Sequence, residues 1–241
     1  MFRFLIIALL WLSAATFNAD ALRISPLVLE VSPSGSGSSG RIRVENNSPA
    51  DLPLEVQVFK ISVDQNGVIE QIPADDDFFV FPPQVIIPAG EPQVIRFQWL
   101  GDPNPQMSQA YFVTMNELPI DLEEGASAVQ FVYSVSALVN IVPRNAEEDT
   151  SLISAEIVAK EDGAKVIRAT FQNDGNKFHN TGQYSWKLDI ADADSYTIPE
   201  EKVTKAVGMG FIPPGGGIRT MEVPLPPEVL GSVLNIEFVG R

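Results

Sequence analysis

The sequence contains no cysteine and only one histidine among its 241 residues. Without cysteine the chain can form no disulfide, thiol nucleophile or cysteine-based metal site. A structural zinc site needs clustered histidine and cysteine ligands at short spacing, which this composition does not supply. Acyl transfer with a histidine base would depend on His179 alone, and no Gly-x-Ser-x-Gly motif is present. The sequence therefore predicts no catalytic residue, no metal site and no cofactor.

Positive charge is also scarce, because 16 lysines and arginines face 31 aspartates and glutamates, a formal net charge of −15. A chain this acidic repels nucleic acids and anionic membrane surfaces. Carboxylates are clustered at 75–77, 123–124 and 147–149, where calcium or glycoside chemistry is an alternative. Acidic runs on so acidic a chain are mostly solvated turns, so a nucleic-acid partner, a calcium site and a glycosidase are all disfavoured.

Long hydrophobic runs are absent except at the N-terminus, where Met1-Phe2-Arg3 precedes the apolar run from Phe4 to Leu12 and then Ala19-Asp20-Ala21. A basic start, a short apolar middle and small residues before a cut are the parts of a secretory signal. The run is shorter than the roughly 20 residues that span a bilayer. We expect residues 1–21 to be a signal peptide that is removed after Ala21, with export of the protein and no membrane insertion after cleavage.

Proline and glycine are plentiful, at 19 and 17 residues, and they separate short apolar runs along the whole chain. Many strands with many turns produce this distribution, which favours an all-β fold. A chain of this length holds two cores more readily than one. Apolar residues make up 45% of the chain, which is enough to build both.

The apolar runs predict strands in two sets, separated by Pro143-Arg144-Asn145 and the acidic residues 147–149. Proline ends the preceding strand, and the acidic residues have little reason to be buried. We therefore expect domains at 22–145 and 146–241. The expected strands of the first are 24–31, 41–45, 54–63, 68–72, 85–87, 94–100, 110–117 and 129–142, and those of the second are 152–160, 165–173, 183–190, 201–207, 220–223 and 233–239.

The apolar segment Val129–Val142 is longer than the usual strand of about five or six residues. Such a strand either crosses a large sheet or projects beyond its own domain, where its apolar face needs a partner. The face that starts with Val129, Phe131, Tyr133 and Val135 is almost entirely apolar.

An ordered series of short segments resembles the periplasmic chaperones of the chaperone–usher pathway, the PapD-like chaperones that assemble bacterial pili. The series is Phe79-Val80-Phe81-Pro82-Pro83, Ile87-Pro88-Ala89-Gly90-Glu91, Val94-Ile95-Arg96-Phe97, Tyr111-Phe112-Val113, Asn116-Glu117-Leu118-Pro119, the strand from Val129, Phe171-Gln172-Asn173-Asp174-Gly175-Asn176 and Ile212-Pro213-Pro214-Gly215. The short loop between Pro119 and Val129 and the missing disulfide are most similar to the archaic branch, whose clients are spore-coat-U-like subunits.

The resemblance implies two immunoglobulin-like β-sandwich domains at an angle, and a non-enzymatic chaperone that stabilises pilus subunits by donor-strand complementation and delivers them to an outer-membrane usher. A pilin-like client lacks its last strand, and the chaperone lends one. Val129, Phe131, Tyr133 and Val135 are then the client-binding side chains. Whether the idle protein caps its own strand as a dimer stays open.

The chain departs from the family where the client's C-terminal carboxylate is anchored, because Val28 and Leu138 occupy the usual basic positions. Arg23 and Arg144 flank these positions and are the candidate replacements. Arg96 and Glu117 match family positions that we interpret as structural, paired near the domain core.

Two other classes of protein share parts of this pattern. An exported immunoglobulin-like adhesin or pilus-associated structural subunit would have the same fold, signal and acidity, but its own chain should cover the last strand of the first domain. A secreted carbohydrate-active or calcium-dependent enzyme would need a cleft lined by carboxylates.

Overall fold

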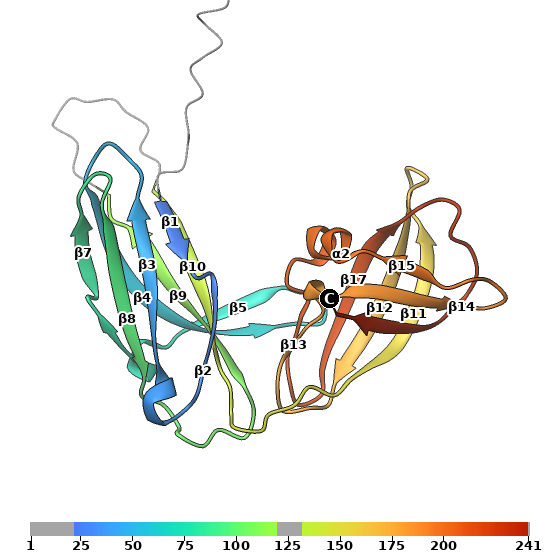
Figure 1. Ribbon diagram of the computed structural model, residues 1–241, viewed down its shortest axis with the longest axis horizontal. Helices are drawn as coiled ribbons and strands as arrows, with labels where there is room; N and C mark the ends of the chain where they lie inside the picture. The colour runs from blue at the N-terminus through green and yellow to red at the C-terminus, as the bar shows by residue number, and fades with distance from the viewer. Residues whose placement is uncertain (1–21, 120–131, 241) are drawn as a thin grey trace, which may run out of the picture.

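The computed structural model describes residues 22–119 and 132–240 and consists mostly of β-strands, which form two sandwiches. Figure 1 shows two lobes joined at an angle, with strands β1 to β10 in one lobe and β11 to β18 in the other. The predicted all-β fold with two sandwiches is confirmed. The predicted signal peptide, residues 1–21, lies outside the described residues.

The first sandwich has a four-stranded sheet in the order β1-β3-β8-β6 and a second sheet in the order β2-β10-β9-β4-β5, with β7 paired to β4. Its elements are β1 (Leu22–Ser25), β2 (Val28–Val31), β3 (Ser39–Asn46), β4 (Leu52–Val63), β5 (Ile69–Pro73), β6 (Phe78–Phe81), β7 (Gln84–Ile87), β8 (Pro92–Trp99), β9 (Gln109–Glu117) and β10 (Ser134–Ile141), with short 3-10 turns at Gly35–Ser38 and Asp75–Asp77.

The second sandwich is built from the sheets β11-β12-β17 and β15-β14-β18, with the short pair β13-β16 beside them. Its elements are β11 (Thr150–Ala159), β12 (Lys165–Asn173), β13 (His179–Asn180), a 3-10 turn (Thr181–Gln183), β14 (Ser185–Ile190), β15 (Tyr196–Ile198), helix α2 (Glu200–Val207), β16 (Phe211–Ile212), β17 (Gly217–Leu225) and β18 (Val233–Val239).

Each sandwich has its own hydrophobic core, and the two cores share no residue. Phe78, Trp99 and Tyr111 pack edge to face or tilted at the centre of the first core, with ring centroids 5.0 to 5.4 Å apart. Trp186 and Phe171 pack in the same way in the second core, at 5.2 Å. Such aromatic pairs stabilise a core beyond their buried area. The domain boundary between 145 and 146 falls between β10 and β11 and stays a proposal.

The expected strand at 201–207 is wrong, because Glu200–Val207 is the helix α2. Glu200 and Glu201 occupy the first turn of the helix, where negative side chains interact favourably with the helix dipole. Gly208 ends the helix with a φ of 61°. Only Val203 is fully buried in this short helix, so the sequence carries too few turns to display a helical period.

The sequence expectations also missed two features of the first sandwich. The segment 24–31 is divided between β1 and β2, which belong to different sheets. The expected strand 129–142 is described only from residue 132 onward, and there the strand begins at Ser134 and ends at Ile141.

The sole histidine, His179, is not a catalytic base but a structural residue of the second sandwich. Its side chain is buried, its Nδ1 lies 2.8 Å from Thr150 Oγ1, and its ring packs edge to face on Tyr184 and Phe238. Burial lowers the pKa of His179, and the nearby Glu148 carboxylate opposes that shift only in part.

Asn46 organises the loops at one end of the first sandwich. Its side chain is fully buried, and Nδ2 donates to the carbonyl oxygens of Ala50, Ile87 and Pro88 at 2.8 to 3.1 Å. Its Oδ1 accepts from the backbone N–H and the hydroxyl of Ser48.

We predict that Asn46→Ala lowers the free energy of unfolding by about 2 kcal/mol, because buried carbonyl groups lose their donor. Urea unfolding followed by circular dichroism measures this loss. The neighbouring Asn47 is exposed, so the control Asn47→Ala changes the free energy by about 0.5 kcal/mol or less. Equal effects of the two substitutions would contradict the role given to Asn46.

The stability of the second sandwich depends on pH through His179. The folded-state pKa of His179 lies below its ordinary value near 6.5, so the unfolded chain binds the proton more readily and acid destabilises the fold. The stability that neutral His179 contributes is complete above pH 6.5 and decreases as the pH falls below it. We expect the difference in unfolding free energy between the wild type and His179→Gln to shrink from pH 8 to pH 5. The carboxylates contribute to the pH dependence of stability in both proteins, so their contribution cancels in this difference.

An NMR titration of the His179 ring in the wild type measures the same property without a variant. A pKa at or above 6.5, or a stability difference that does not change with pH, would contradict this account.

Candidate functional site

The open edge of β10 is the first part of the candidate site. On one side β10 pairs with β9 along its whole length, from Ser134 opposite Asn116 to Ile141 opposite Gln109. On the other side it pairs with β2, in parallel, only from Leu138 to Ile141. Within residues 22–119 and 132–240, no strand pairs with the stretch 134–137 on that side.

The hydrogen bonds show which backbone groups point to this open edge. Glu117 N–H donates to the carbonyl of Tyr133, whereas Leu138 N–H donates to the carbonyl of Leu27. In an antiparallel pair, alternate residues direct both backbone groups to the same neighbour. Val135 and Ala137 therefore direct theirs to β9, and Ser134 and Ser136 direct theirs to the open edge.

The expected client-binding side chains are only partly described, since Val129 and Phe131 lie outside the described residues. Tyr133 is 45% exposed and the preceding Val132 is 55% exposed. Val135 is half-buried and packs against the core of its own sandwich. Val135 thus lies where the core ends and the exposed segment begins, and its role in client binding stays a prediction.

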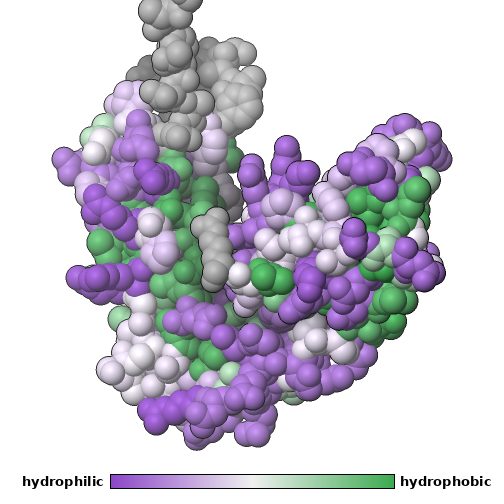
Figure 2. All heavy atoms as spheres, turned by 45° about the vertical axis from the view of Figure 1, so that its right-hand side comes forward, coloured by the Kyte–Doolittle hydropathy of each residue, from purple (hydrophilic) through white to green (hydrophobic). Residues whose placement is uncertain are grey.

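An apolar cleft of about 520 Å³ lies between the two sandwiches and forms the second part of the site. The first sandwich contributes Leu27, just before β2, and the strand residues Val28, Phe112, Ser136 and Leu138. Its β4–β5 hairpin contributes Ile61, Val63, Gly67 and Ile69, and the second sandwich contributes Val207, Met209, Gly210, Phe211 and Arg219. Figure 2 shows hydrophobic surface on the first lobe next to the junction between the lobes.

Ser136 and Leu138 connect the two parts of the site. They belong to β10 and also line the cleft. Leu27 and Val28 are 59% and 41% exposed and lie where the pairing of β2 with β10 begins. The open edge therefore runs directly into the apolar cleft.

Two sets of contacts hold the sandwiches on either side of the cleft. At the connecting segment, Ser108 N–H donates to the carbonyl of Asn176, and Phe178 N–H donates to Ser108 Oγ. At the tip of the β4–β5 hairpin, Thr220 N–H donates to the carbonyl of Gln65 at 2.8 Å. Figure 1 shows β5 reaching from the first lobe to the second.

Arg219 of β17 is held against the same hairpin. Its Nη1 donates to the carbonyl of Asp64 at 3.2 Å, and its Nε is buried with no hydrogen-bond partner in the described structure. Gly67, with a φ of 90°, lies directly under the guanidinium, where a Cβ would come within 2.3 Å of Nη1. Burial lowers the pKa of Arg219, and the Asp64 carboxylate opposes that shift.

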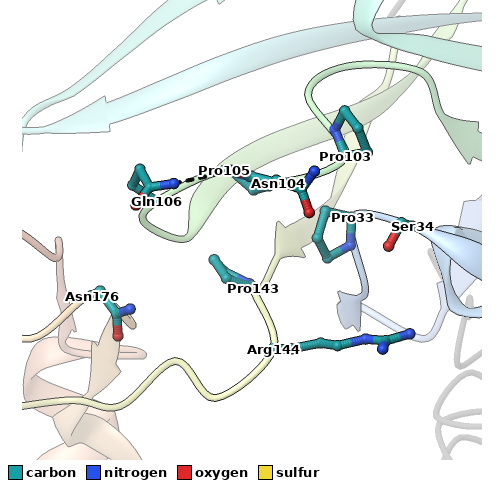
Figure 3. Close-up of a pocket in the computed structure, with 9 residues that line it drawn as sticks. All are labelled: Pro33, Ser34, Pro103, Asn104, Pro105, Gln106, Pro143, Arg144 and Asn176. Carbon is teal, nitrogen blue, oxygen red and sulfur yellow. Dashed lines mark hydrogen bonds between the residues drawn. The ribbon is translucent and has the colours of Figure 1, made fainter.

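Neither of the expected carboxylate anchors lies in the cleft. Arg23 is exposed on β1, opposite Glu45 of β3, in the other sheet of the first sandwich. Arg144 lines a separate crevice of about 380 Å³ at the connecting segment, with Pro33, Pro103 and Asn176 among its neighbours. Figure 3 shows its side chain directed away from Asn176. Neither arginine lines the apolar cleft, and a role of Arg23 or Arg144 as carboxylate anchor stays a prediction.

The expectation that Val28 and Leu138 replace a basic pair stays a prediction. They are direct cross-strand partners, and both line the cleft. The expected pairing of Arg96 with Glu117 is wrong. Arg96 is exposed on β8, and Glu117 lies in the opposite sheet, where its Oε2 accepts from Tyr133 N–H at 3.1 Å.

The described residues contain no group of three or more histidine, cysteine, aspartate or glutamate side chains arranged to hold a metal ion. A glycosidase needs a pair of carboxylates in its cleft. No carboxylate is among the described residues that line the apolar cleft. What the site offers is unpaired backbone, apolar surface and one guanidinium.

Comparison with known proteins identifies the fold. No protein-family model matches the chain, and no curated protein matches it in sequence. A solved structure of the class 5 fimbriae chaperone CfaA has a TM-score of 0.54 at 16% identity, covering 91% of this chain and 99% of that one. The E. coli chaperone DraB has a TM-score of 0.50 at 14% identity, covering 90% and 95%.

A chain from the Salmonella enterica complex of the SafA pilin with the SafB chaperone has a TM-score of 0.51 at 12% identity, covering 91% of this chain and 96% of that one. These similarities extend over both sandwiches and the segment that connects them. The chain therefore has the two-domain β-sandwich fold of the fimbrial chaperones.

Proposed function

We propose that this protein is a periplasmic chaperone that binds pilus subunits by β-strand addition at the open edge of β10. The observation that carries the proposal is the unpaired edge of Ser134–Ala137, which runs into an apolar cleft. Natural proteins usually cover or interrupt a free strand edge, because it invites pairing with another chain. An edge that stays open beside apolar surface is what a partner lacking one strand requires.

The chemistry of the edge fits a polypeptide client. Ser134 and Ser136 offer backbone donors and acceptors for a strand, and the exposed Val132 and Tyr133 offer apolar side chains at the end of β10. A fully buried side chain of this size contributes about 1.5 to 3 kcal/mol, before the cost of association is subtracted. Binding of this kind needs no catalytic group.

The solved structures of similar fold support the same function. One is a complex of a pilin with its chaperone, and another is a chaperone in complex with a tip adhesin, with a TM-score of 0.53 at 17% identity. Delivery of the client to an outer-membrane usher belongs to the proposal, as does a dimer in which two idle copies cover each other's open edge. Export through a cleaved signal peptide would place the protein in the periplasm. In the described part of the chain, no helix is long and apolar enough to cross a membrane.

The alternative of an exported adhesin is less well supported. An adhesin should cover the last strand of its first sandwich with its own chain, whereas the described residues leave part of β10 uncovered. The cleft that continues this edge is apolar and lies between two sandwiches held by hydrogen bonds. Such a concave apolar surface suits the capture of a partner.

We predict that Tyr133→Asp reduces the yield of pilus subunit that co-purifies with the protein from periplasm at least tenfold. The substitution places a charge where apolar surface has to be buried. Tyr133 is 45% exposed, so the fold should be preserved, which circular dichroism checks. Partner yield is measured by quantitative mass spectrometry.

Ile86→Asp is the matched control. Ile86 lies on β7 of the same sandwich and is 65% exposed, but β7 pairs with β4 at the far side of the sheet from β10. We expect the subunit yield of this variant to equal that of the wild type. Normal yield with Tyr133→Asp, or equal losses with both variants, would count against strand addition at β10.

A further inference from the structure

Three polar side chains connect the open half of β10 to the middle of its sheet. Asn116 of β9 lies between the other two, and its Oδ1 accepts from Ser134 Oγ of β10 at 2.6 Å. Its Nδ2 donates to Gln57 Oε1 of β4 at 2.9 Å. We call Ser134, Asn116 and Gln57 the polar row. It crosses three strands and begins at the strand whose edge is open.

The polar row lies on the face of the sheet that points away from the hydrophobic core. Successive side chains of a strand point to opposite faces. Val56 and Met115, which precede two members of the row, belong to the core, and Val135, which follows the third, packs against it. All three members are exposed or half-buried. Water can satisfy such groups, so the specific effect of the row is to connect strands.

Side-chain hydrogen bonds to β9 are concentrated in the half of β10 that has an open edge. Ser134 and Ser136 are both bonded through their hydroxyl groups to the residues opposite them on β9, at 2.6 and 2.9 Å. Just before the strand, the N–H of Tyr133 donates to the Glu117 carboxylate at 3.1 Å. In the half from 138 to 141, where β2 covers the other edge, the described residues form no such bond.

Asn140 shows that this difference is not one of composition alone. It is the only polar residue in the half from 138 to 141, and it is fully buried. Neither its Nδ2 nor its Oδ1 has a hydrogen-bond partner in the described structure. A polar side chain on β10 is therefore not bonded to β9 as a matter of course. The bonds occur where the strand lacks a second neighbour.

The open half of β10 has a physical need for these bonds. A strand held by one neighbour separates from its sheet at a lower cost in free energy than a strand held by two. In the detached form, the extended backbone that a client would pair with is lost, and binding has to restore it. Each side-chain bond to β9 has to break before the stretch 134–137 detaches. The bonds therefore keep the population of the detached form low.

We propose that Asn116 is a positioning residue, which keeps the stretch 134–137 extended and attached to β9 in the absence of a client. This inference rests on the proposed function, because strand addition is what needs an ordered edge. Asn116 lies one strand away from the open edge and acts through Ser134. Gln57 binds the amide nitrogen of Asn116, so the amide oxygen stays directed to Ser134.

Native-state hydrogen exchange, followed by NMR, measures how often the stretch detaches. The N–H of Val135 points to β9, so it exchanges when this half of β10 separates from the sheet. We expect Asn116→Ala to speed the exchange of Val135 about threefold, because one hydrogen bond to β10 is lost. The rate should not change at low urea concentration, which identifies local detachment and not global unfolding.

Further variants locate the effect. Ser134→Ala removes the same bond from the other side and should also speed exchange about threefold, and combining it with Asn116→Ala should add little. Thr114→Val removes the bond to the second serine, so together with Asn116→Ala it should speed exchange about tenfold. Gln84→Ala is the matched control. It removes a 2.9 Å bond between β7 and β4 of the same sheet, and it should leave the exchange of Val135 unchanged.

A binding measurement connects the ordered edge to the capture of a strand. The probe is the synthetic peptide acetyl-Lys-Lys-Thr-Val-Ser-Val-Thr-Val-amide, whose dissociation constant is measured from the backbone amide signals of Ser134 and Ser136. The apparent affinity decreases with the fraction of molecules in the attached form. We expect the dissociation constant to rise about twofold in the variant that carries both Asn116→Ala and Thr114→Val. It should stay at the wild-type value in Gln84→Ala.

The outcomes separate this inference from the proposed function. If Asn116→Ala leaves the exchange of Val135 unchanged, or if Gln84→Ala speeds it equally, the positioning role is overturned, whatever the peptide does. Faster exchange with an unchanged dissociation constant also overturns it, while strand addition stands. If the peptide does not shift the signals of Ser134 and Ser136 in the wild type, strand addition at this edge fails. Thermal unfolding confirms that each variant is folded.

Discussion

The pairing of β10 changes at Leu138, and the properties of the site depend on this change. Beyond Leu138 the strand has neighbours on both sides and is fully part of its sheet, whereas before it the strand has a neighbour only at β9. The short length of β2, from Val28 to Val31, sets this limit. A sheet edge that is half covered has two consequences. It exposes backbone groups to another chain, and it defines the position at which that chain must end. An edge left open along its whole length would provide the first property without the second.

The second sandwich gives this edge its surroundings. Hydrogen bonds at the connecting segment and at the tip of the β4–β5 hairpin hold the two sandwiches on both sides of the apolar cleft. The hairpin also presents the carbonyl of Asp64 to Arg219, so one local structure joins the sandwiches and positions the only charged side chain among the described residues that line the cleft. The resemblance in sequence to fimbrial chaperones and the similarity in fold to their solved structures are consistent with this arrangement.

Much of the fold could be predicted from the alternation of apolar and polar residues. The expected strands 165–173 and 233–239 have the same bounds as β12 and β18, because period-two alternation marks half-buried strands. The helix α2 was missed because it is short and buries one residue fully. The positions of the anchor candidates outside the apolar cleft could not be predicted, for a different reason. Arg23 precedes the buried Ile24 by one position, and a shift of one residue in a strand moves a side chain to the opposite face. Arg219 lies 155 positions from Asp64, and no local pattern indicates such a contact.

If β10 binds a pilus subunit by strand addition, its edge is open in the free protein and paired in the complex. Hydrogen exchange of single backbone amides, measured by NMR with and without a bound pilus subunit, distinguishes the two states. Val135 and Ala137 direct their N–H groups to β9, and their amides should exchange slowly in both states. Ser134 and Ser136 direct theirs to the open edge, and their amides should exchange rapidly in the free protein and slowly in the complex. Slow exchange at Ser134 and Ser136 in the free monomer, or rapid exchange in the complex, would contradict the account.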